Sequence, residues 1–287
     1  MQKYALRLCI GSAVLAAFGA FLRWMQLQVS FEKDTGLAVR GSMWPYLLAV
    51  WLAVGAVYLA VVIARMQRRG RARLPKTFAA AFRPDTVLTP ALSLLFGLIM
   101  VAGGLMLVLR TPLAERQRAL VMILGAVAVL TGLSYPVYLL RAGEEEPPSA
   151  LRAVLATFPI ALFAFWLIVS YKMHIVNPTV SAYAPEIITI AAASIAFFRL
   201  AGFAFQRPQP AKALFWGSWS AFLCMLGMAD SRYLGMQLLL IAAAGMMLLQ
   251  VWLIGMHAER QKHIKKQGAF TKNAPCFVLN TGGAMEP

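Results

Sequence analysis

The stretch that decides the fold is Tyr233–Met256, which reads YLGMQLLLIAAAGMMLLQVWLIGM and contains no Asp, Glu, Lys or Arg. An α-helix rises about 1.5 Å per residue, so about 20 residues cross a hydrocarbon core that is about 30 Å thick. This stretch is therefore long and apolar enough to span a membrane. Three other uncharged stretches have the same character: Met43–Ala64, Thr86–Leu109 and Ala119–Leu140.

The composition of the whole chain supports the same interpretation. Of its 287 residues, 60% are hydrophobic and 13% are charged, whereas soluble domains have about 45–50% apolar and about 25% charged residues. So few charges cannot cover a water-facing surface of this size. Buried helices of a large soluble core are the alternative, but the chain offers no amphipathic helices to cover them. The sequence therefore predicts an all-α, polytopic transmembrane helical bundle.

About eight spans are predicted. The first is the least clear, because its uncharged core, Leu8–Leu22, is short and lies between Arg7 and Arg23. It could be a cleaved signal peptide, but apolar residues continue to Leu27 and arginines at helix ends can extend to the interface, so we favour an uncleaved span. The spans are expected near residues 4–27, 43–65, 88–109, 113–140, 151–171, 186–206, 212–229 and 231–256. Residues 257–287 are expected to form a cytoplasmic, largely disordered tail, which begins as a charged helical stub and is disordered beyond about Gln267.

Lys and Arg residues are expected to gather in cytoplasmic segments. Placing the N-terminus inside puts most of the 27 Lys and Arg residues on the cytoplasmic side of eight spans. Both chain ends are therefore predicted to be cytoplasmic. The run Glu144–Pro148, EEEPP, divides the spans into two four-helix halves, and a weak similarity at a spacing of 140 residues raises the hypothesis of an internal repeat.

The longest predicted cytoplasmic loop, residues 65–85, is strongly basic and has two phenylalanines one helical turn apart. With a net charge of +16, the chain could suggest nucleic acid, but anionic headgroups attract each basic side chain by about 1 kcal/mol. Lipid is the expected partner, through a short helix on the inner leaflet with its rings in the bilayer; a solvated loop is the alternative. The predicted inner-leaflet contacts are Arg68, Arg69, Arg71, Arg73, Lys76, Phe78 and Phe82.

Several charges near or within the spans are candidates for a ligand site or a gate. Arg199 is the only charge well inside a predicted span, and an intramembrane charge costs at least about 2.5 kcal/mol at the membrane centre. It could also anchor its helix by reaching the interface. The predicted outer helix ends gather charges of both signs, which could bind a small polar ligand or form the watery rim of the bundle. The candidates are Arg199, Glu186, Asp230, Arg23, Glu32, Asp34 and His174.

The sequence contains no recognisable catalytic, cofactor-binding or metal-binding motif. It has no His-Glu-x-x-His motif, no nucleophile elbow, no phosphate loop and no dinucleotide fingerprint. Its three histidines lack the spacing of a metal site. No cofactor is therefore expected, enzymatic activity is the less favoured interpretation, and the oligomeric state stays open.

The segment Phe31–Leu37, FEKDTGL, resembles a stretch in uncharacterised multi-spanning membrane proteins of Gram-positive anaerobic bacteria. The resemblance covers the first span and the loop after it, and the rest of the chain only by hydropathy. It implies a bacterial plasma membrane but no mechanism. Within the segment, Glu32 and Asp34 could contact a cation or a basic partner, or simply form a turn.

Three functions stay open at this point. A transporter or permease for a small solute is supported by the eight spans and by Pro136 and Pro159, which are expected to kink their helices. A non-catalytic scaffold, sensor or assembly factor is supported by the basic cytoplasmic face. A lipid-modifying intramembrane enzyme is least favoured, because no acid–base or nucleophile pair is recognisable.

Overall fold

Helices make up almost all of the structure, a computed structural model that describes residues 2–32, 37–39, 41–70, 74–84, 86–110, 115–143, 150–174, 179–230 and 232–272. A helix satisfies every backbone N–H and C=O within its own segment, which an apolar environment requires. Within the described ranges, the extended pairing is one isolated antiparallel bridge between Phe31 and Ala38. The prediction of an all-α helical bundle is therefore confirmed.

The described residues form nine α-helices and two short 3₁₀ helices (η), and eight of the α-helices contain 17 or more residues. In chain order they are α1 (Gln2–Val29), α2 (Trp44–Gly70), α3 (Phe78–Phe82), α4 (Leu88–Arg110), α5 (Glu115–Leu140), η1 (Arg141–Gly143), α6 (Ala150–His174), α7 (Val180–Ala201), α8 (Pro210–Leu226), η2 (Gly227–Ala229) and α9 (Leu234–Lys272).

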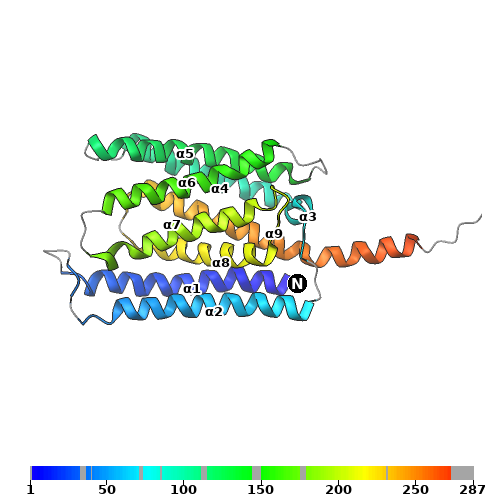
Figure 1. The fold of residues 1–287 in the computed structure, drawn as a ribbon, viewed down its shortest axis with the longest axis horizontal. Helices are drawn as coiled ribbons and strands as arrows, with labels where there is room; N and C mark the ends of the chain where they lie inside the picture. The colour runs from blue at the N-terminus through cyan, green and yellow to red at the C-terminus, as the bar shows by residue number, and fades with distance from the viewer. Residues whose placement is uncertain are drawn as a thin grey trace, which may run out of the picture.

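The long helices pack side by side in one bundle (Figure 1). The N-terminus, the short helix α3 and the projecting carboxyl part of α9 all lie at one end of this bundle, which we call the terminal end. The opposite end, where α1 finishes and α9 begins, is called the far end. This arrangement places the start and the finish of the bundle on the same side.

Seven of the described helices are long and apolar enough to cross a membrane: α1, α2, α4, α5, α6, α7 and α9. The chain is therefore a multi-pass membrane protein. The eighth predicted span, 212–229, corresponds to α8, whose 17 residues extend about 26 Å. Although α8 is shorter than the hydrocarbon core, it lies inside the bundle and packs against α1, α7 and α9.

Helix α9 forms the centre of the bundle. In its apolar part, Leu234–Ala258, 78% of the most apolar window is buried, against 28% for α2. It packs against α1, α3, α4, α7 and α8. Outer helices instead expose large apolar side chains such as Val50, Val57 and Leu98, and a lipid environment makes such exposure favourable.

Two pairs of glycines bring α4 and α5 into close contact. A Cβ added at Gly104 would lie 2.6 Å from the carbonyl oxygen of Gly125, and one added at Gly97 would lie 2.6 Å from that of Gly132. Pro136, four residues after Gly132, has no N–H to bond that carbonyl. Small residues at these positions allow the two backbones to approach, which is a common way to hold helices together in lipid.

The two halves expected from the sequence are not separate bundles. Helix α9 packs extensively on α4, and α1 packs on α8 and α9. In a four-helix repeat, α4 would correspond to α8 and α5 would correspond to α9. The interface between α4 and α9 would then be matched by one between α8 and α5, and the described residues form no comparable interface between those two helices. The contacts therefore do not have the symmetry that the repeat hypothesis requires.

The carboxyl boundary of the last helix also differs from the expectation. We predicted that the last span ends near residue 256 and continues as a charged helical stub, with disorder beyond about Gln267. The structure shows α9 as a continuous helix to Lys272, so the helix extends past the predicted limit of the stub. Residues 273–287 lie outside the described part of the chain.

Candidate functional site

Four charged side chains meet at the far end and form what we call the charge cluster: Arg23, Glu186, Asp230 and Arg232. Arg23 Nε lies 2.6 Å from Asp230 Oδ1, and Arg232 Nη2 lies 2.6 Å from Asp230 Oδ2. Arg232 Nη2 is also 3.6 Å from Glu186 Oε2. The cluster joins α1, α7 and the segment before α9, and its two positive and two negative groups balance each other.

Arg23 is fixed by the broken backbone of α7. Pro185 lies inside this helix and has no N–H to bond the carbonyl of Ser181 four residues earlier. Arg23 donates to this carbonyl and to the next one: Nη1 donates to Ser181 O at 3.4 Å, and Nη2 donates to Ala182 O at 2.5 Å. Nη1 also donates to Gln26 Oε1 at 2.9 Å. Every nitrogen of the buried guanidinium is therefore used, which points to a structural role.

Arg232 differs from Arg23 in how its donors are used. Its Nη2 reaches Asp230, but Nε and Nη1 are buried and have no hydrogen-bond partner within the described residues. Its side chain is 6% exposed. The structure brings three of the predicted ligand or gate candidates, Arg23, Glu186 and Asp230, into this cluster, whereas Arg232 was not among the predicted candidates.

The remaining predicted far-end residues lie around this cluster. Ser170 Oγ donates to Glu186 Oε1 at 3.0 Å, which links α6 to the cluster. His174, one helical turn later, contacts Ser170 O through Nδ1 at 2.8 Å and packs against the ring of Tyr183. Glu32 lies after α1, where its backbone N–H donates to Leu37 O. Asp34 lies outside the described residues.

Arg199 is at the opposite end of α7 and lies at the end of its span, Val180–Ala201, rather than well inside it. The predicted span 186–206 is instead α7, Val180–Ala201, so Arg199 lies in the last turn of the helix. The prediction of an interior charge was wrong because the helix begins before Pro185 and is shifted toward the N-terminus. Arg199 is half-buried, and its Nη1 donates to Gln209 Oε1 at 2.9 Å.

The phenylalanines of α3 are buried in protein rather than in lipid. Phe78 and Phe82 are 5% and 0% exposed. The Phe78 ring meets Tyr138 edge-on at 4.9 Å, and the Phe82 ring meets Phe203 edge-on at 5.2 Å. The guanidinium of Arg152 lies 4.7 Å from the centre of the Phe78 ring, a favourable cation–π arrangement.

The predicted insertion of these two rings into the inner leaflet was therefore wrong. Edge-to-face partners and a cation are available inside the protein, and such ring pairs are stabilised beyond their buried area. We call Phe78, Phe82, Tyr138 and Phe203 the aromatic plug. Lipid contact by the basic residues stays a prediction: Arg68 and Lys76 are exposed, whereas Arg71, Arg73 and the side chain of Arg69 lie outside the described part.

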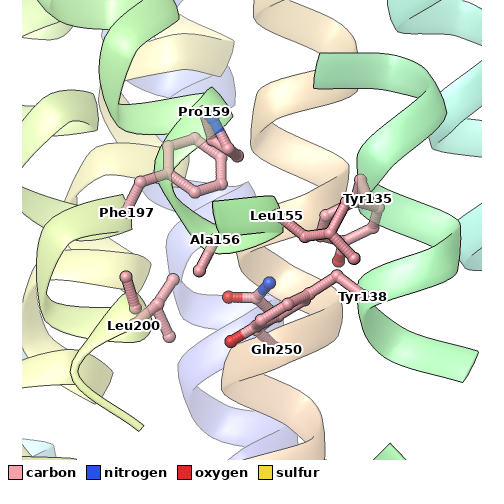
Figure 2. Close-up of a pocket in the computed structure, with 9 residues that line it drawn as sticks. Tyr135, Tyr138, Leu155, Ala156, Pro159, Phe197, Leu200 and Gln250 are labelled. Carbon is pink, nitrogen blue, oxygen red and sulfur yellow. The ribbon is translucent and has the colours of Figure 1, made fainter. Parts of the chain in front are cut away.

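A small pocket lies next to the aromatic plug, between α5, α6, α7 and α9 (Figure 2). Its volume is about 10 Å³, which is about the space that one water molecule needs. Apolar side chains from α6 and α7 form most of the wall, and the polar side chains are Tyr135, Tyr138 and Gln250. None of the described lining residues is charged.

Two polar atoms of the pocket have no partner within the described residues, namely Tyr138 Oη and Gln250 Oε1. Tyr135 differs, because its hydroxyl donates to Met246 O at 3.0 Å. Figure 2 shows the Tyr138 hydroxyl and the Gln250 amide reaching into the same space. Leaving buried polar groups unpaired costs about 1–3 kcal/mol each, so this geometry favours a polar guest.

The kink of α6 lies beside the same site. Pro159 lies inside α6 and lines the pocket. Because proline has no N–H, the carbonyl of Leu155, four residues earlier, loses its usual helical donor. Leu155 also lines the pocket, so the break in the helical hydrogen bonding of α6 lies beside it.

The sequence analysis missed this site because it searched for charges and catalytic motifs. Tyr138 and Gln250 are neutral, and each lies within a run that reads as ordinary membrane-spanning sequence. A glutamine inside the uncharged membrane-spanning run Tyr233–Met256 was the usable signal, since an amide in hydrocarbon needs partners.

No family model, curated protein or solved structure matches this chain. Within the described residues, no group of three or more His, Cys, Asp or Glu side chains is arranged to hold a metal ion. The function is therefore argued from the pocket, the aromatic plug and the charge cluster alone.

Proposed function

We propose that this protein is a carrier for a small, uncharged polar solute in a bacterial plasma membrane, with the terminal end in the cytoplasm. The observation that carries the proposal is a neutral pocket with two unpaired polar atoms, Tyr138 Oη and Gln250 Oε1, enclosed within a bundle of membrane-spanning helices. A binding site inside the bundle, built partly on proline-broken helices, is typical of secondary transporters.

The two ends of the bundle are closed in different ways. At the terminal end the aromatic plug adjoins the pocket through Tyr138, which lines the pocket and packs on Phe78 of α3, a helix of only five residues. At the far end the charge cluster ties α1, α7 and the start of α9 together. Gln250 follows Leu234 by 16 residues, so about 24 Å of packed helix separates the pocket from the far end. The terminal end is the shorter way out.

The charges near the pocket favour an uncharged solute. No described lining residue is charged, and a charge without a partner is costly at membrane depth. Arg152 contacts the plug through Phe78, with its guanidinium 4.7 Å from the centre of that ring. Its positive charge disfavours a cation at Tyr138, which packs on the same ring.

The test is uptake of a panel of labelled uncharged solutes by proteoliposomes that contain the full chain. The proposal expects saturable uptake above that of empty liposomes for at least one solute, and loss of this uptake in Tyr138→Phe and Gln250→Met. Tyr171→Phe is the matched control, because Tyr171 is 60% exposed and lies outside the pocket. Uptake equal to that of empty liposomes across the panel would refute the carrier.

A second candidate function is a non-catalytic membrane module. It is favoured by the terminal end, where Arg65 and Arg68 are exposed and where α9 projects beyond the bundle (Figure 1). This hypothesis predicts that charge reversal of Arg68, Arg69, Arg71 and Arg73 abolishes partner recovery in pull-downs while expression is unchanged. Equal recovery with the reversed variant would rule out this version.

A further inference from the structure

We infer that the corner between α7 and α8 at the terminal end binds the headgroup phosphate of an anionic phospholipid. This α7–α8 corner, Phe198–Lys212, consists of the last turn of α7, the loop after it and the first turn of α8. It packs against α3 through the Phe203 ring, which meets Phe82 at 5.2 Å. The inference concerns a different part of the molecule from the pocket and does not depend on the carrier proposal.

Three basic side chains belong to the α7–α8 corner: Arg199, Arg207 and Lys212. Arg199 lies two residues before the end of α7, and Lys212 lies two residues after the start of α8. At about 1.5 Å per residue, each lies within about 3 Å of the loop along its helix axis. Because α7 and α8 pack side by side, both side chains leave the bundle at a similar depth.

The loop between the two helices is folded back on itself and carries the third basic residue. The Arg207 N–H donates to Gly202 O at 2.9 Å. Gln206 has φ 56°, in the left-handed region that residues with side chains rarely occupy, and this conformation turns the chain back. Arg199 Nη1 donates to Gln209 Oε1 at 2.9 Å, so its guanidinium lies against the loop that carries Arg207.

The three cations are not neutralised by the described part of the chain. The ion pairs among the described residues all belong to the charge cluster at the far end. Arg207 and Lys212 are exposed. Arg199 uses Nη1 for Gln209 and has Nε buried, whereas its Nη2 is neither buried nor hydrogen-bonded to a described residue. The corner therefore offers donors and positive charge to an anionic group.

Apolar rings beside the cations favour a lipid over a water-soluble anion. Phe198 and Phe205 are 59% and 51% exposed, and the Arg199 guanidinium lies 5.8 Å from the centre of the Phe198 ring. Exposed rings at the end of a membrane-spanning helix can contact acyl chains, which a soluble anion lacks. Basic sites between membrane-spanning helices are known to bind lipid headgroups, and a phospholipid matches both the cations and the rings.

The experiment measures thermal unfolding of the full chain, purified in detergent, against increasing dioleoyl phosphatidylglycerol or dioleoyl phosphatidylcholine. The two lipids have the same acyl chains and phosphodiester, but phosphatidylcholine carries a compensating positive charge. We therefore expect phosphatidylglycerol to raise the Tm with a half-maximal concentration at least about tenfold lower. Equal half-maximal concentrations would overturn the inference.

A third arm uses glycerol 3-phosphate, which has a phosphate group and no acyl chains. It should give no increase in Tm at the concentration at which phosphatidylglycerol has its full effect. An increase equal to that of phosphatidylglycerol would show a site for soluble phosphates and would overturn the assignment to a lipid.

Variants show whether the preference for phosphatidylglycerol comes from the α7–α8 corner. Arg207→Gln and Lys212→Gln should each raise its half-maximal concentration about fivefold, the factor that corresponds to one basic side chain near an anionic surface. The charge-retaining changes Arg207→Lys and Lys212→Arg should keep the wild-type value. If one glutamine variant does not fold, the other provides the test.

The matched control is Arg68→Gln at the same end of the bundle. Arg68 is exposed on α2, which packs on α1 and α8 but forms no comparable interface with α7 within the described residues. This variant should bind phosphatidylglycerol as the wild type does. Glutamine variants of the corner that bind like the wild type, or an equal weakening by Arg68→Gln, would show attraction to the whole surface and overturn the inference.

Discussion

Replacing Arg23 with methionine removes the cation that holds three helices together at the far end. Methionine keeps an apolar stem of similar length, so the change isolates the guanidinium. The lost contacts are those to Asp230 Oδ1 at 2.6 Å, Gln26 Oε1 at 2.9 Å and the carbonyls of Ser181 and Ala182. The side chain is 1% exposed, so water cannot replace these contacts.

The expected loss of unfolding free energy can be estimated from these contacts. Removing one partner of a buried ion pair costs about 3–5 kcal/mol. Asp230 keeps Arg232 Nη2 at 2.6 Å, which lowers this cost. The Ser181 carbonyl, whose helical donor is missing at Pro185, is left without a donor and raises it by about 1–3 kcal/mol. These effects oppose each other, so we expect a loss of about 3–5 kcal/mol.

The assay is equilibrium unfolding in mixed micelles of mild detergent and dodecyl sulfate, followed by circular dichroism. Arg7→Met is the matched control on the same helix, because Arg7 is exposed, and we expect it to change stability by about 1 kcal/mol or less. A double-mutant cycle with Asp230→Asn should give a coupling of at least about 1 kcal/mol. A loss of under about 1 kcal/mol for Arg23→Met, or strict additivity in the cycle, would refute the reasoning.

Three further changes test other parts of the structure by the same unfolding measurement. Gly104→Ala should lower the free energy of unfolding by about 1–3 kcal/mol, because its Cβ would lie 2.6 Å from a carbonyl oxygen of α5. Gly227→Ala is the control and should be nearly neutral, because the nearest atom to its Cβ is 3.6 Å away. Equal effects of the two changes would contradict the close approach of α4 and α5. Phe78→Ala should lower the free energy of unfolding by about 3–5 kcal/mol if the ring is buried in protein. No measurable loss of stability would indicate that the ring contacts lipid instead. Arg232→Met should lower the free energy of unfolding less than Arg23→Met does, because two buried nitrogens of Arg232 already lack partners within the described residues. A larger loss than that of Arg23→Met would contradict this.

The fold was predictable because the apolar runs are long. A run such as Tyr233–Met256 has one stable arrangement in lipid, so its helical state follows from length and composition. Helix ends were harder to predict. The sixth span was predicted to begin at residue 186, just after Pro185, but Arg23, which is far away in the sequence, donates to the carbonyls of Ser181 and Ala182 before the proline. Helix α7 therefore begins at Val180, before Pro185, although the local sequence alone favours a start at the proline.

The candidate site was only partly predictable. Charges at helix ends led directly to Arg23, Glu186 and Asp230, because opposite charges removed from water must pair. The rings of α3 were predicted to be buried in an apolar medium, and a one-dimensional pattern cannot say whether that medium is lipid or protein. The polar atoms of the pocket are neutral, so their importance depends on what lies opposite them in three dimensions.

The central position of α9 has a consequence for how the protein is made. Ribosomes synthesise this helix after the other eight, yet it supplies the surface on which α1, α4 and α8 pack. During translation those helices are already in the bilayer, with an unfilled groove where Leu234–Ala258 will lie. A nascent chain stopped before this segment would expose small and polar residues to lipid and would be a target for membrane quality-control proteases. Assembly of the bundle is therefore completed only when its carboxyl-terminal core helix enters.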